Sequence, residues 1–207
     1  KETHGNNITV GAQNMHHETH GAFTGEASAT MIKDAGASFV LIGHSERRHV
    51  FNESNDFINK KIHRAIKENI QPILCIGELL GEREEGKTND VLAKQLTEGL
   101  KDVSISDLKN IIVAYEPVWA IGTGKTATPE IAQEAHNFIR SYVRKNWGDA
   151  IADDLIIQYG GSVKPENAHE LMKNEDIDGV LVGGASLKPD VFGNIVNFEH
   201  YQSPQKV

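Results

Sequence analysis

The chain has 207 residues, which is enough for one large domain or two small ones. Hydrophobic residues make up 39% of it and charged residues 24%, a composition that excludes a disordered chain. The formal net charge of −8 argues against general binding to nucleic acid or to membrane surfaces, so an anionic ligand would need a local positive site.

Cys75 is the only cysteine, so no internal disulfide can form. It lies in an apolar run, which favours a buried and inert strand position over a reactive thiol. No apolar run approaches the ~20 residues that span a bilayer, and no signal peptide is visible. We therefore predict a cytoplasmic location. The sequence starts at Lys1 rather than at methionine, which is consistent with processing or with a start inside a longer protein.

Short apolar runs alternate with helical patterns along the whole chain, which predicts a single α/β domain over residues 1–207 with a parallel sheet. We predict strands at residues 8–12, 39–43, 73–77, 111–115, 155–159 and 179–182. Helices are predicted near residues 28–35, 56–69, 89–100, from 128 onward, 165–173 and 189–197. The helix after Thr128 starts with a hydroxyl N-cap and a proline, and its expected inward residues are Ile131, Ala135, Phe138, Ile139 and Tyr142.

A (β/α) barrel and an open doubly wound sheet both fit this alternation. The positions of the polar and glycine residues favour the barrel. They follow several different strands, whereas an open sheet would concentrate them at one switch point. The residues at these strand ends are His44, Glu78, Glu116, Gly160 to Ser162, Gly183 and Gly184.

Glu116 directly follows an apolar strand and precedes Pro117-Val118-Trp119. A solvated or arginine-paired carboxylate is the simpler interpretation. A partly desolvated carboxylate has a raised proton affinity, however, and suits a general base. The small residues that follow, Gly122 to Lys125, are typical of a loop that closes as a lid. A nucleotide-binding P-loop would need glycine at position 119, which is tryptophan.

His44 ends the second strand. It is either held by backbone groups or kept neutral by the free N–H groups of a helical turn that follows, in which case it could donate a hydrogen bond to a substrate oxygen. Gly160-Gly161-Ser162 and Gly183-Gly184 end the last two strands, where glycine lets backbone N–H groups approach a phosphate. The histidines at positions 16, 17 and 20 lack the spacing of a zinc motif and are interpreted as incidental.

Taken together, these stretches resemble the triosephosphate isomerases, from about Val10 to Leu187. The resemblance rests on long motifs: residues 11–14 (GAQN), 21–26 (GAFTGE), 41–48 (LIGHSERR), 75–78 (CIGE), 114–124 (AYEPVWAIGTG), 159–163 (YGGSV) and 182–187 (VGGASL). It implies a TIM (β/α)₈ barrel that interconverts dihydroxyacetone phosphate and D-glyceraldehyde 3-phosphate, without a cofactor or a metal.

The resemblance also implies residue roles. Glu116 would move the proton between carbons, and His44 would polarise the carbonyl. The family is an established example of a glutamate base paired with a neutral histidine. Glu46 would support the site as a nearby carboxylate. The phosphate would be held by Gly122, Ser162, Gly183 and Gly184. The loop from Gln13 to Glu26 would form the contact of a homodimer. Asn14, Thr24 and Glu26 would belong to this dimer loop, and Thr24 would reach the partner's site.

The resemblance is incomplete at its start. The family has eight strands in ~250 residues, and six are visible here, so the first two βα units are absent from these 207 residues. The first strand of the family ends in an asparagine and a lysine that contact the substrate, and nothing upstream of Ile8 supplies them. We therefore expect an N-terminally incomplete barrel that is poorly active or inactive by itself. The alternative function is a truncated fragment that at most binds phosphate or assembles with partner chains.

Overall fold

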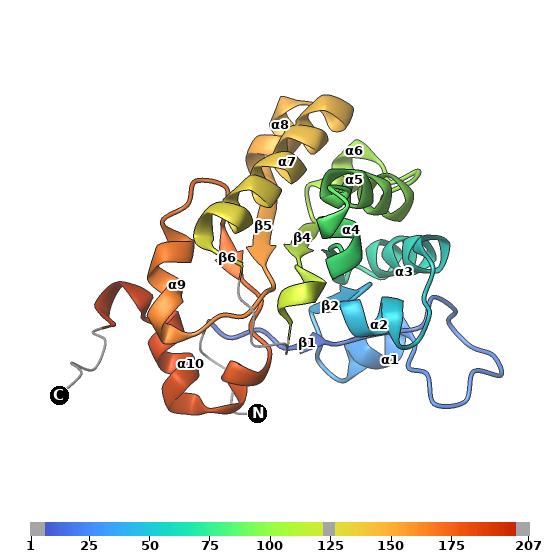
Figure 1. The fold of residues 1–207 in the computed structure, drawn as a ribbon. Helices are drawn as coiled ribbons and strands as arrows, with labels where there is room; N and C mark the ends of the chain where they lie inside the picture. The colour runs from blue at the N-terminus through green and yellow to red at the C-terminus, as the bar shows by residue number, and fades with distance from the viewer. Residues whose placement is uncertain (1–6, 122–126, 202–207) are drawn as a thin grey trace. The chain divides into compact units, whose positions relative to one another are not determined.

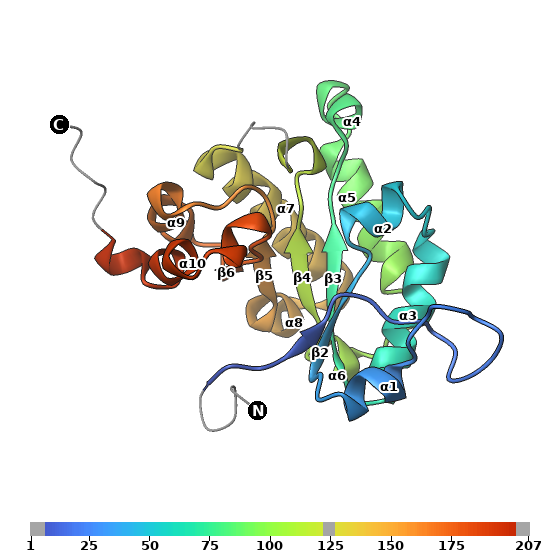
Figure 2. The ribbon, with the colours of Figure 1, turned by 90° about the horizontal axis from the view of Figure 1, so that it is seen from below.

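The computed structural model describes residues 7–121 and 127–201. The chain divides into two compact units. The first comprises residues 1–76 and 92–113, and the second comprises residues 77–91 and 114–207. Strand and helix alternate along the chain in both (Figures 1 and 2). Two elements, α5 (Thr88–Gly99) and β4 (Ile112–Tyr115), run from one unit into the other. Each unit is described separately below.

The first unit contains three parallel strands in chain order, β1 (Gly11–Ala12), β2 (Phe39–Ile42) and β3 (Gln71–Ile76). Gly11 lies opposite Phe39, and Ile42 lies opposite Leu74. The helices of this unit, apart from α5, are α1 (Ala29–Asp34), α2 (Ser45–His49), α3 (Asn55–Lys67) and α6 (Ile105–Leu108). Helix α3 packs against β2 and β3 (Figure 2). Its apolar side, Ile58, Ile62 and Ala65, is fully buried there.

The second unit contains the end of β4 followed by the parallel pair β5 (Ile156–Tyr159) and β6 (Gly179–Val180). Its helices are α4 (Leu80–Glu84), α7 (Pro129–Trp147), α8 (Asp149–Asp154), α9 (Pro165–Met172) and α10 (Pro189–Val196), with 3₁₀ turns η1 (Val118–Ala120), η2 (Gly184–Leu187) and η3 (Phe198–His200). Helix α8 packs against α7, and α9 packs against α10 (Figure 1).

All six predicted strands are present, but the first and the last are shorter than predicted; β6 ends at Val180 rather than at residue 182. The first covers only the end of the range 8–12, because Ile8 is 63% exposed and Val10 is 46% exposed, so neither is held by a packed layer. The burial of β3 from Pro72 to Ile76 is continuous, and Cys75 is fully buried, as predicted. The short helices α4, α6 and α8 were not predicted, since four to six residues are too few to show a helical period.

The predicted inward face of α7 was partly wrong. Ala135 and Ile139 are buried as predicted, but Ile131, Phe138 and Tyr142 are only half-buried. The other buried positions are Ala132, His136 and Val143. The buried stripe is therefore rotated toward a histidine, and the apolar residues that seemed to mark the stripe lie at its border.

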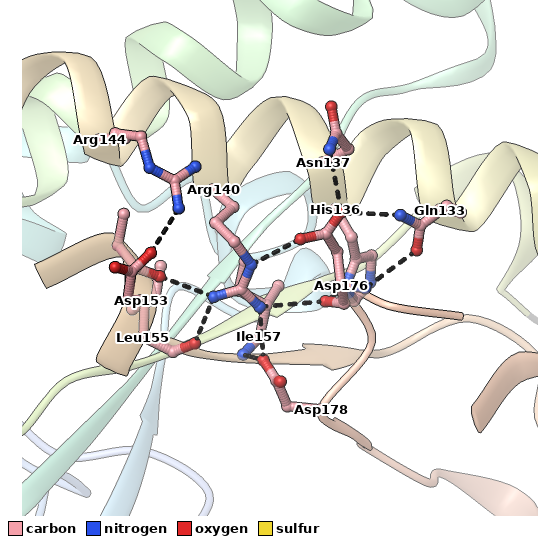
Figure 3. Close-up of polar contacts among 11 residues, drawn as sticks. Gln133, His136, Asn137, Arg140, Arg144, Asp153, Leu155, Ile157, Asp176 and Asp178 are labelled. Carbon is pink, nitrogen blue, oxygen red and sulfur yellow. Dashed lines mark hydrogen bonds and ion pairs between the residues drawn. The ribbon is translucent and has the colours of Figure 1, made fainter. Parts of the chain in front are cut away.

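A polar cluster explains that rotation (Figure 3). Asp176, which is buried before β6, accepts hydrogen bonds from Gln133, Asn137 and Arg140 of α7, at 2.7, 3.0 and 2.6 Å. His136 Nδ1 donates to the Asp176 carbonyl at 3.0 Å. Burial alone would raise the pKa of Asp176, but the hydrogen bonds from Asn137, Arg140 and Gln133 outweigh it and hold that pKa below its ordinary value.

Arg140 extends the cluster to both neighbouring strands. It donates to the carbonyls of Ala152 and Leu155 before β5, at 2.7 and 2.9 Å, and to the carboxylate of Asp178 at 2.8 Å. Asp178 in turn accepts from the Ile157 amide of β5 at 2.7 Å. One guanidinium therefore joins α7 to the segments that lead into β5 and β6 (Figure 3).

We expect Asp176→Ala to lower the free energy of unfolding by about 3–5 kcal/mol, because it leaves the largely buried Arg140 without its main counter-charge. Asp153→Ala is the matched control. Asp153 pairs with Arg144 at the surface, so its loss should cost less than about 1 kcal/mol. Urea unfolding of both variants measures the difference, and equal losses would contradict the role assigned to Asp176.

A second prediction concerns acid stability. Burial lowers the pKa of His136 to about 4 in the folded protein, whereas an unfolded histidine titrates near ~6.5. The unfolded chain therefore binds a proton first as the pH falls, so the stability due to neutral His136 is full above pH ~6.5 and is lost between there and about 4. The loss should reach about 3 kcal/mol. His136→Asn should flatten the stability curve over this pH range; parallel curves for the two proteins would refute the assignment.

Candidate active site

His44 leaves β2 through a strained turn and begins α2. The preceding residue, Gly43, has a φ of +78°, a conformation that favours glycine. The imidazole Nδ1 accepts a hydrogen bond from the Glu46 amide at 3.3 Å, which makes His44 the N-cap of α2. Since Nδ1 accepts, the proton of the neutral ring lies on Nε2. This contact fits both interpretations of the sequence, because a backbone group holds the ring and an N–H group of the following helical turn faces its nitrogen.

Glu46 touches His44 through its backbone, while its side chain is exposed on the first turn of α2. Asn14 of the predicted dimer loop is half-buried, and its Oδ1 accepts from Lys61 Nζ at 2.7 Å. Thr24 and Glu26 are exposed. Arg64 of α3 also donates to the His17 carbonyl at 2.7 Å, so contacts with α3 anchor the loop at Asn14 and at His17.

Lys61 is a buried charge that the sequence analysis missed. Its side chain is fully buried on α3 and lies 2.7 Å from Glu53 Oε1. Burial lowers the pKa of Lys61, and the hydrogen bond and charge of Glu53 oppose that effect. The signal was available, because Lys61 follows Ile58 by three positions and therefore lies on the inward face of the helix.

The predicted dimer loop also contains a cluster of rings. His16 stacks on His17 and Phe23, with ring centroids 4.5 and 4.1 Å apart, and Phe57 of α3 packs against both histidines.

Across residues 7–121 and 127–201, no group of three or more His, Cys, Asp and Glu side chains could hold a metal ion.

Glu116 lies in the second unit, directly after β4, and is 2% exposed. Two glycines allow neighbouring backbone to approach it. A Cβ at Gly77 would lie 1.7 Å from the Glu116 carbonyl oxygen, and a Cβ at Gly160 would lie 2.8 Å from Glu116 Cγ. The carboxylate is therefore desolvated, as the sequence predicted, and its position depends on these two glycines.

Glu78 is a second buried carboxylate close to this segment. It is fully buried and accepts from the Tyr115 hydroxyl at 3.1 Å and from the Trp119 indole at 2.8 Å. Arg83 lies 3.6 Å from its Oε1 and stacks over the Trp119 ring. Burial, the Glu78 charge and the hydrogen bond to Glu78 raise the pKa of Tyr115. Glu78 thus holds the residues on both sides of Glu116. The sequence marked its place at a strand end but not this role.

The two glycine turns lie at the same edge as Glu116. Tyr159 of β5 is opposite Val180 of β6, so the turns after these strands are neighbours. The Gly160 amide donates to the Tyr115 carbonyl at 2.7 Å, which joins the first turn to the end of β4. Ser162 is half-buried before α9, and Gly183 and Gly184 are exposed before α10. The fourth predicted phosphate-binding residue, Gly122, lies outside the described residues, as does the whole predicted lid from Gly122 to Lys125.

The predicted site residues therefore fall into two groups. His44, Glu46 and Asn14 belong to the first unit, and Glu116, Ser162, Gly183 and Gly184 belong to the second. Within each unit, these residues follow the carboxyl ends of parallel strands. That the two groups form one site remains a prediction.

Comparison with known proteins decides which family has this arrangement. The family model described as triosephosphate isomerase matches residues 1–199. The chain belongs to the triosephosphate isomerase family. A triosephosphate isomerase of Fusobacterium nucleatum is 56% identical over 196 residues, which cover 95% of this chain and 78% of the relative. One of Alkaliphilus metalliredigens is 54% identical over 191 residues, covering 92% of the chain and 77% of the relative.

Family membership confirms the predicted resemblance and the (β/α) barrel class, of which this chain contributes six strands. It also agrees with the choice of the barrel over the doubly wound sheet. A relative from Carboxydothermus hydrogenoformans is 55% identical over 192 residues, covering 93% of this chain and 76% of the relative.

The packing around Glu116 predicts that Gly77 cannot be replaced. We expect Gly77→Ala to destabilise the protein by about 3 kcal/mol or more, because the added methyl would overlap the Glu116 carbonyl. Gly81→Ala is the matched control, since nothing lies within 4 Å of its Cβ and alanine in helix α4 should add about 0.5–1 kcal/mol. Thermal unfolding compares the two variants, and equal Tm values would contradict the predicted overlap.

Proposed function

We propose that this chain interconverts dihydroxyacetone phosphate and D-glyceraldehyde 3-phosphate, as an aldose–ketose isomerase of glycolysis and gluconeogenesis. Membership of the triosephosphate isomerase family is the observation that carries the proposal. The buried Glu116 and the neutral His44 are the groups that this chemistry requires.

Glu116 acts as the base. It removes a proton from C1 of dihydroxyacetone phosphate and returns it to C2, which converts the ketose to the aldose through an enediolate. Burial supports this role, because a carboxylate kept away from bulk water exchanges the transferred proton slowly with solvent. Gly77 approaches the Glu116 main chain and Gly160 approaches its Cγ, and this packing supports the alignment of the side chain with the carbon acid.

His44 stabilises the oxygen on which negative charge develops. Its Nδ1 is occupied by the Glu46 amide, so Nε2–H is the donor that can polarise a substrate carbonyl. In this proposal the neutral imidazole donates its Nε2 proton to one substrate oxygen and takes a proton back from the other. The ring therefore ends the step in the state in which it began. Glu46 contributes its amide to this arrangement, and its carboxylate is a supporting group in this proposal.

The phosphate is held by backbone groups at the turns that begin α9 and α10. Ser162, Gly183 and Gly184 supply these contacts, with Gly122 from the loop after Glu116. Turns without a side chain let N–H groups approach a phosphate closely. This form of binding suits a protein whose formal net charge is −8, because it does not need a cluster of arginines.

The proposal extends to assembly and location. The loop from Gln13 to Glu26 forms a homodimer and carries Thr24 to the partner's site, and its exposed tip supports that role. We place the protein in the cytoplasm, where triose phosphates are made and consumed, with no nucleic acid or membrane as a partner. In the described parts of the chain, every helix is too short or too polar to span a bilayer.

Glu116→Asp tests the base directly. The substitution keeps the carboxylate but withdraws it by one methylene, so turnover should fall about 100-fold or more while KM changes by less than about 3-fold. Both constants are measured in a coupled isomerase assay, on the protein in the form in which its natural host makes it. Glu84→Asp, the same change at an exposed position, should leave them unaltered. Unchanged turnover in Glu116→Asp would remove Glu116 as the base.

A further inference from the structure

Arg48, on the last turn of α2, folds back onto the turn that carries His44. Its Nε donates to the Gly43 carbonyl at 2.7 Å. Its Nη2 donates to the Cys75 carbonyl at 2.9 Å, and Nε also lies 3.3 Å from that oxygen. Gly43 directly follows β2 and Cys75 is the second-to-last residue of its parallel neighbour β3, so one guanidinium joins the carboxyl-terminal parts of both strands.

These contacts hold the two peptide groups of His44. The Gly43 carbonyl belongs to the peptide bond that links Gly43 to His44. The Arg48 amide donates to the His44 carbonyl itself, at 3.0 Å. The carbonyls on both sides of the His44 Cα are therefore bonded by one residue, through its side chain on one side and its main chain on the other.

The guanidinium is itself fixed from behind. Its Nη1 donates to Asn55 Oδ1 at 2.6 Å, and Asn55 Nδ2 donates to Glu98 Oε2 at 2.7 Å. The bond to Glu98 sets the orientation of the Asn55 amide, so its oxygen faces Arg48. The packing is also tight, because a Cβ at Gly43 would lie 3.0 Å from Arg48 Nη2.

We propose that Arg48 is a positioning residue that sets the backbone from which the His44 imidazole projects, and thereby the direction of its Nε2–H. The proposal rests on the role assigned to His44 above and adds the residue that fixes the orientation of its imidazole ring. Arg48 does not touch the substrate. Its effect is on the placement of a donor whose usefulness falls steeply with displacement, since a shift of ~1 Å can cost ~100-fold in rate.

Arginine is needed here because of its shape. The three acceptors, Gly43 O, Cys75 O and Asn55 Oδ1, lie around one planar group, whose Nε, Nη2 and Nη1 donate to them, with Nε shared between the two carbonyls. A lysine ammonium keeps the charge but has a single nitrogen at the end of a flexible chain, so it cannot hold this geometry. Arg48→Lys therefore removes the hydrogen-bond geometry that orients His44 while it keeps the positive charge.

In the protein as its natural host makes it, we expect Arg48→Lys to lower kcat by roughly 10–100-fold with KM within about 2-fold. Histidine-selective ¹H–¹⁵N NMR, with His44 assigned from His44→Gln, should show altered His44 ring signals and a new population with the proton on Nδ1. Arg144→Lys, the same change at an arginine that pairs with the surface acids Asp149 and Asp153, should leave kcat and the His44 signals unchanged.

Asn55→Ala is the second variant and covers the case in which Arg48→Lys does not fold. It keeps the guanidinium but removes its rear support, so kcat should fall less than in Arg48→Lys, and the His44 signals should shift in the same direction. If either folded variant keeps kcat within about 2-fold and leaves the His44 ring signals unchanged, Arg48 only stabilises the fold and the proposal is overturned. If His44→Gln itself keeps kcat, the proposed function of His44 fails, and the NMR comparison alone then judges the positioning by Arg48.

Discussion

Parallel strand pairing is the constraint on which the rest of this structure depends. In a parallel pair both strands end at the same edge, so residues far apart in the chain are brought together without any direct attraction between them. In the second unit this places Glu116 beside the turn at Gly160, through the hydrogen bond from Gly160 to Tyr115. In the first unit it places Gly43, which precedes His44, near Cys75, so that one arginine can donate to both carbonyls.

Buried charges are the second recurrent feature, and each has its own set of partners among the described residues. Glu78 accepts from a tyrosine and a tryptophan, Lys61 donates to Glu53 and Asn14, and Asp176 accepts from three side chains of α7. A buried charge without such partners would cost several kcal/mol. These groups therefore specify which surfaces meet, because any other arrangement would leave a charge in an apolar place without compensation.

Much of this arrangement was predictable from the sequence. The six strands followed from apolar runs, and Glu116 and His44 followed from their places at strand ends. The buried polar residues were harder to predict. Lys61 and His136 lie on helix faces where a polar residue interrupts the apolar period. Some of the partners that accompany their burial are distant in the sequence: Asn14 is 47 residues from Lys61, and Asp176 is 40 residues from His136. The short helices α4 and α8 show no period, and the contact of Arg48 with Cys75 has no local signal at all.

The attachment of α7 has a consequence for synthesis of the chain on the ribosome. Its partners Asp176 and Asp178 follow Arg140 by 36 and 38 residues. At a translation rate of 5–20 residues per second, about 2–8 seconds pass between the synthesis of Arg140 and the synthesis of the two aspartates that pair with it. During that interval Arg140 and the half-apolar face around it remain exposed. The helix α7 therefore gains these partners only after the segment that contains Asp176 and Asp178 has been synthesised.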